Sequence, residues 1–93
     1  MHKGPAQQEM EGLLAAAFPG AVIALTNDSA AHHGHSGDDG SGESHFSLHI
    51  IWDGFAGLNR VARQRAVNAA LGDIPGNRVH ALAMKTETPQ EAQ

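Results

Sequence analysis

Cysteine is absent from the 93 residues of the chain. This absence excludes disulfides, thiolate metal ligands, a cysteine nucleophile and CxxC redox chemistry. Aromatic residues are sparse, with one tryptophan, three phenylalanines and no tyrosine. Hydrophobic residues nevertheless make up 41% of the sequence, which indicates a folded chain rather than a disordered one. We therefore expect residues 1–93 to form a single small domain.

Long hydrophobic runs are also missing. The longest, Leu13–Phe18 and Ala21–Leu25, fall far short of the roughly 20 apolar residues that a membrane helix needs. Glu9 and Glu11 interrupt the stretch that would otherwise resemble a secretory leader. The sequence therefore predicts a cytoplasmic protein with no membrane association.

Periodicity of the apolar residues predicts two helices and three strands. Spacings of three and four residues predict helices over Pro5–Phe18 and about Arg60–Leu71, the second with Val61 on its inner face. Ala21–Asn27 is a short apolar segment typical of a strand. Strict alternation of Phe46, Leu48, Ile50 and Trp52 with more polar residues predicts the clearest strand, and Arg78–Lys85 is the last one.

The order of these elements predicts the fold class. Two strands joined by a loop should pair antiparallel, whereas strands joined through a helix should lie parallel. The result is an α+β domain with a three-stranded mixed sheet, helices on one face and the other face open to solvent or a partner. The segment 28–43 has no large apolar residue and is expected to be a flexible His/Gly-rich loop, and a polar tail is expected from residue 86.

Histidines from separate parts of the sequence should converge at one edge of this sheet. If the last two strands are parallel, His80 lies near His45 and near the loop that carries His32, His33 and His35. Neutral imidazole is a good ligand for iron, zinc and copper, but two histidines do not complete a structural site. A site shared with another molecule is one interpretation. Hydrogen-bonded or solvated histidines without a ligand are the other.

A group of arginines is the second candidate for function. Arg60, Arg63 and Arg65, with Arg78, could face phosphates, and Gly54–Gly57 spells the G-x-x-G of phosphate-clamping loops. The alternative is an ordinary solvated helix face, and the formal net charge of −4 argues against tight nucleic-acid binding. No catalytic constellation is visible, because the serines near histidines lie in a glycine-rich loop that cannot position them. We expect no enzyme activity.

The motifs together resemble the BolA family, in the same order and over nearly the whole chain. The matching segments are Asp28–His35, Gly42–Phe46 with its "SHF", Phe55–Gly57, Arg63–Arg65, Val79–Ala83 with its "VHAL", and Thr88-Pro89.

This resemblance implies a class II KH-like αββααβ fold and a non-enzymatic adaptor in iron–sulfur homeostasis. BolA proteins partner monothiol glutaredoxins and share a 2Fe-2S cluster with them and with glutathione, through a strand histidine matching His80 and a loop residue matching His32. His33 and His35 could substitute for the loop ligand. Gln64 departs from the histidine that many relatives carry. Other members are DNA-binding transcriptional regulators, so DNA is the alternative partner. The free protein is expected to be a monomer or weak homodimer.

Overall fold

The computed structural model describes residues 4–28 and 44–93, and the expected histidine loop therefore lies almost wholly outside the described residues. The described elements are α1 (Pro5–Ala17), β1 (Val22–Asn27), β2 (His45–Ile51), the short 3₁₀ helix η2 (Asp53–Phe55), α2 (Arg60–Leu71) and β3 (Ala81–Glu87). Their order along the chain is the one expected for αββααβ, with η2 in the place of the middle helix.

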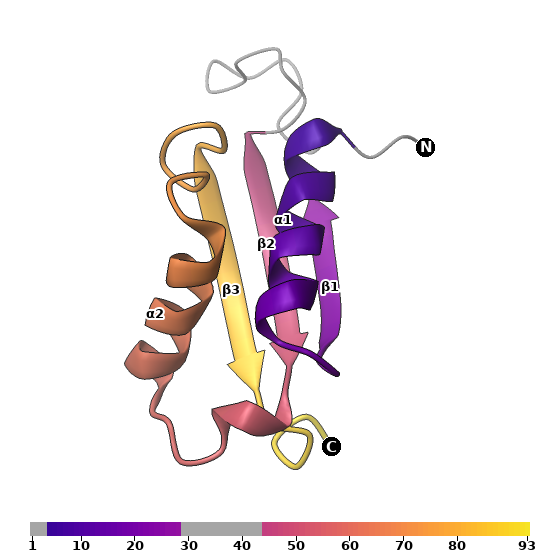
Figure 1. The fold of residues 1–93 in the computed structure, drawn as a ribbon, viewed down its shortest axis with the longest axis vertical. Coiled ribbons are helices and arrows are strands. Elements are labelled where there is room, and N and C mark those ends of the chain that lie inside the picture. The colour runs from indigo at the N-terminus through magenta and orange to yellow at the C-terminus, as the bar shows by residue number, and fades with distance from the viewer. Residues whose placement is uncertain (1–3, 29–43) are drawn as a thin grey trace.

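The three strands form one mixed sheet in the order β1-β2-β3. β1 and β2 are antiparallel, β2 and β3 are parallel, and both long helices lie on the same face (Figure 1). The predicted α+β class and strand directions are confirmed. The parallel register pairs His45 with Ala81, so the starts of β2 and β3 lie side by side.

Local sequence explains where the helices begin and end. Pro5 occupies the first turn of α1, where its missing N–H leaves no intrahelical bond unmade. The side chain of Asn59 caps α2 by accepting a hydrogen bond from the backbone N–H of Ala62 at 2.8 Å. Gly72 ends α2 with a φ of 65°, a conformation that glycine adopts without strain.

The core lies between the helices and alternate residues of β2. Phe46 and Leu48 are each 2% exposed and Ile50 is fully buried, as the alternation predicts. Burying each of these side chains contributes about 1.5–3 kcal/mol relative to leaving it exposed. Phe55 is also fully buried and makes a T-shaped contact with Trp52. The sheet face that carries Phe46 is therefore fixed by the hydrophobic effect.

The prediction that Val61 belongs to the inner face of α2 is wrong, because Val61 is 53% exposed. Val67 and Leu71, four residues apart, carry the inward stripe of this helix. The residue four positions before Val67 is Arg63, so the inward position in the first part of the helix belongs to Arg63 rather than to Val61. Arg63 accordingly has a side chain that is only 11% exposed.

The last strand starts and ends later than predicted. Residues 74–80 form a turn in which the Val79 N–H donates to the Ile74 carbonyl at 2.9 Å, and Val79 is fully buried there. β3 therefore starts at Ala81, not at residue 78. At its other end it stays paired with β2 through Glu87, which extends the strand past residue 86, and the polar tail begins at residue 88.

Candidate functional site

His45 and His80 come together at the shared starts of β2 and β3. Their ring centroids are 5.3 Å apart. His45 is half-buried at the start of β2, and His80 is exposed immediately before β3 begins. The predicted convergence of these two histidines is confirmed.

Ser44 fixes the position of His45. It is 1% exposed, and its carbonyl accepts a hydrogen bond from the Ala81 N–H at 3.0 Å, which ties the start of β2 to that of β3. Its hydroxyl lies 3.0 Å from Nδ1 of His45. This contact helps to set the orientation of the His45 ring.

Asp28 and Ser44, the described residues on either side of positions 29–43, lie at the same place. Asp28 donates its backbone N–H to the His45 carbonyl at 2.8 Å, and its carboxylate accepts a hydrogen bond from the Ser47 hydroxyl. Asp28 and Ser44 are therefore both close to the His45–His80 pair. His32, His33 and His35 themselves lie outside the described residues.

The His45–His80 spacing is compatible with joint coordination. Two imidazoles bound to one tetrahedral metal at roughly 2.0–2.1 Å have ring centroids about 5 Å apart. Within residues 4–28 and 44–93, no group of three or more histidine, aspartate or glutamate side chains could hold a metal ion. A metal at this pair would therefore need further ligands from the segment 29–43 or from another molecule.

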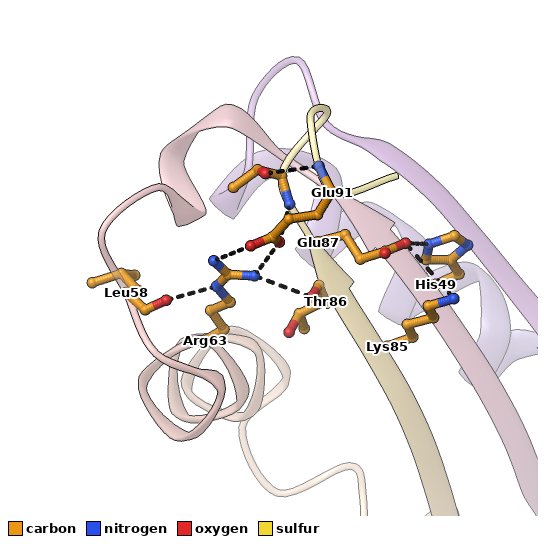
Figure 2. Close-up of polar contacts among 8 residues, drawn as sticks. His49, Leu58, Arg63, Lys85, Thr86, Glu87 and Glu91 are labelled. Carbon is orange, nitrogen blue, oxygen red and sulfur yellow. Dashed lines mark hydrogen bonds and ion pairs between the residues drawn. The ribbon is translucent and has the colours of Figure 1, made fainter. Parts of the chain in front are cut away.

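Arg63, predicted as a phosphate contact, is engaged within the chain (Figure 2). Its Nε donates to the Leu58 carbonyl at 2.9 Å and its Nη1 to the Thr86 carbonyl at 3.3 Å. Nη1 and Nη2 donate to the two carboxylate oxygens of Glu91 at 2.6 and 3.2 Å. The hydrogen bond from Arg63 is the main reason that the pKa of Glu91 falls from 4.5 to about 2. The same bond raises the pKa of Arg63.

The other predicted arginines are exposed but do not form one cluster. Arg60 and Arg65 are exposed and pair with no side chain in the described part of the chain. Arg78 follows the far end of α2, in the turn before β3, and pairs with Glu9 at 2.5 Å. Arg60 begins α2, which is about 18 Å long, whereas Arg78 lies in the turn beyond the other end of this helix.

The G-x-x-G segment has a packing role. A Cβ atom on Gly54 would overlap the ring of Trp52, and Gly57 has a φ of 83° that favours glycine. Phe55 between them is fully buried. Both glycines are thus explained without a phosphate.

The sequence did not point to two polar contacts of β3. Nε2 of His49 lies 2.6 Å from Oε1 of Glu87, and Nζ of Lys85 lies 3.9 Å from the same oxygen (Figure 2). His49 is the register partner of Lys85 on the parallel strands, and Glu87 follows Lys85 by two residues, on the same face of the sheet. The predicted parallel pairing of these strands is therefore the signal that could have placed the three side chains together. Glu91 was missed because its partner, Arg63, is distant in sequence.

Comparison with known proteins agrees with this architecture. The family model for BolA-like proteins matches residues 14–91. The chain belongs to the BolA family. It is 39% identical over 87 residues to a Vibrio cholerae protein named DNA-binding transcriptional regulator BolA, covering 94% of this chain and 78% of that protein.

Two further relatives show the same family likeness. Human BolA-like protein 1 is 36% identical over 88 residues, covering 95% of this chain and 61% of the human protein. The solved BolA domain of SufE1 from Arabidopsis thaliana has a TM-score of 0.81 and 29% identity, covering 97% of this chain and 99% of that domain. No described helix of this BolA chain has the length and apolar content to cross a membrane.

Proposed function

We propose that this BolA protein is a non-enzymatic cytoplasmic adaptor that shares a 2Fe-2S cluster with a monothiol glutaredoxin. The observation that carries the proposal is the exposed ring of His80 beside His45, at the sheet end where the flanking residues Asp28 and Ser44 also lie. A cluster iron accepts imidazole ligands, and this site offers them at a solvent-accessible edge. The chain has no cysteine, so thiolate ligands would come from the partner's active-site cysteine and from glutathione.

His80 is the first proposed ligand, and its neighbours in the chain fix its position. It follows the fully buried Val79 and precedes Ala81, whose N–H is bound to the Ser44 carbonyl. His32 is the proposed second ligand, with His33 and His35 as substitutes. Because His33 and His35 could take the place of His32 as the second ligand, His32→Ala should weaken cluster binding only in part.

The proposal is tested by co-expression with a monothiol glutaredoxin. The purified complex should be coloured, and its visible absorption spectrum should differ from that of the glutaredoxin alone with its own cluster, because imidazoles replace thiolates on one iron. Stable complex formation with the spectrum of the glutaredoxin alone would contradict shared ligation. Failure of the two proteins to associate, with or without cluster, would contradict the partnership itself.

A DNA-binding regulator is the second candidate. The Vibrio cholerae relative, which is named as one, and the exposed Arg60 and Arg65 support it. Phosphate contacts release counterions, so each should add about 0.9 to the slope of log affinity against log salt. Arg60→Ala/Arg65→Ala, which leaves Arg63 in place, should weaken binding and reduce that slope by about 1.8. Unchanged binding at every salt concentration would exclude these arginines as the contact surface.

A further inference from the structure

The guanidinium group of Arg63 makes two kinds of hydrogen bond, one to backbone carbonyls and one to a carboxylate. On one side, the carbonyls of Leu58 and Thr86 accept hydrogen bonds and hold the group in place. The other side presents Nη1 and Nη2 as a fork to the carboxylate of Glu91 (Figure 2). The guanidinium also lies 5.8 Å from the ring centroid of Phe55. It is therefore a preorganised two-donor site whose present ligand is a side chain of the same protein.

The segment that supplies this ligand is weakly attached. Residues 89–93 are all exposed. Thr88 and Glu91 bond to one another, through the Thr88 N–H to Oε1 at 2.8 Å and the Glu91 N–H to Oγ1 at 3.3 Å. Among the described residues, Arg63 alone provides hydrogen bonds from outside the segment 88–93. The Glu91 side chain is 47% exposed and the segment makes no other hydrogen bond to the rest of the described chain, so another anion that binds Arg63 can displace it at small cost.

A phosphate can replace the carboxylate at this fork. Arginine binds both groups through two parallel N–H···O bonds of the same geometry. Arg60, one helical turn before Arg63, is exposed and lies on the same side of α2. An extended phosphate backbone could therefore engage both arginines once Glu91 has left.

We propose that Arg63 is a nucleic-acid phosphate site and that Glu91 occupies it in the free protein as an autoinhibitory mimic of phosphate. This proposal rests on the DNA-binding function named above as the second candidate. It adds to that function a regulatory role for the segment 88–93. DNA has to displace Glu91 to gain the Arg63 contact, so the free protein binds DNA less tightly than its arginines allow.

The test measures binding of a short double-stranded DNA by fluorescence anisotropy over a range of salt concentrations. Glu91→Gln removes the carboxylate charge but leaves the contacts of Arg63 with Leu58 and Thr86. Asp73→Asn is the matched control, because Asp73 is exposed, has no partner among the described residues and carries the same charge. Relative to Asp73→Asn, Glu91→Gln should bind about eightfold more tightly at 0.1 M salt and have a salt slope larger by about 0.9.

The possible results distinguish failure of the proposed role of Glu91 from failure of the DNA-binding function. Equal affinities and slopes for the two variants, with salt-sensitive binding by both, would overturn the role of Glu91 and leave the DNA-binding function standing. No binding by the wild type or either variant would overturn both. Thermal unfolding of the variants checks that each is folded, which the exposed positions of Glu91 and Asp73 lead us to expect.

Discussion

The imidazole rings of His45 and His80 lie 5.3 Å apart although the two residues are 35 positions apart in the sequence. Parallel pairing of β2 with β3 creates this proximity, because it aligns His45 with Ala81. The buried Ser44 stabilises it through contacts with both His45 and Ala81. The two histidines are thus held together by the backbone pairing of β2 with β3.

The orientation of β2 predicts a large difference between two adjacent substitutions. Leu48 is 2% exposed, so Leu48→Ala should destabilise the protein by about 2–5 kcal/mol through lost burial and a residual cavity. Ser47 is exposed on the opposite face, and Ser47→Ala should cost far less, although it loses the bond to Asp28. Chemical denaturation measures both free energies of unfolding. Equal losses for the two variants would mean that the face of β2 is assigned wrongly.

Two glycines offer a matched test of the packing around Trp52. Gly54→Ala places a methyl group on the Trp52 ring, which should cost about 1–3 kcal/mol as the ring is displaced. Gly12→Ala adds the same methyl group to α1 in open space, and should instead stabilise the helix by about 0.5–1 kcal/mol. Melting temperatures that move in opposite directions are expected. A stable Gly54→Ala protein would contradict the contact with Trp52.

The ion pair between Arg63 and Glu91 should make a pH-dependent contribution to stability. The pKa of Glu91 is lowered from 4.5 to about 2 in the folded protein, chiefly by the hydrogen bond from Arg63. A lowered folded-state pKa means that the contribution is present above pH 4.5 and is lost as the pH falls from 4.5 through 2. The difference in unfolding free energy between wild type and Glu91→Gln should therefore shrink over that range. A difference that stays constant from pH 7 to pH 2 would show that the pair is not formed in solution.

Local signals allowed most of the fold to be predicted from the sequence. Asn59 and Gly72 mark the ends of α2 as predicted, because caps depend on residues that adjoin the helix. Val61 was misplaced because valine is usually buried, and only the tertiary contacts of Arg63 show that the inward position belongs to a charged residue. The start of β3 was misplaced because Val79, although apolar and β-branched, is buried in a turn.

The candidate site was predictable in part for the same reason. The convergence of His45 and His80 follows from strand order alone, which the sequence pattern supplies. The contact between Arg63 and Glu91 could not be predicted, because it joins α2 to a segment beyond β3 through side-chain geometry. An arginine and a glutamate that were both solvated and made no contact would give the same sequence pattern as Arg63 and Glu91.

The central claim is that His80 ligates a cluster shared with a monothiol glutaredoxin, and visible absorption of the co-purified complex tests it. His49→Ala is the control, since His49 is also a histidine of the sheet but is paired with Glu87. The account predicts that the His49→Ala complex keeps the mixed imidazole–thiolate spectrum and that the His80→Ala complex loses it. An unchanged spectrum in the His80→Ala complex would contradict the account.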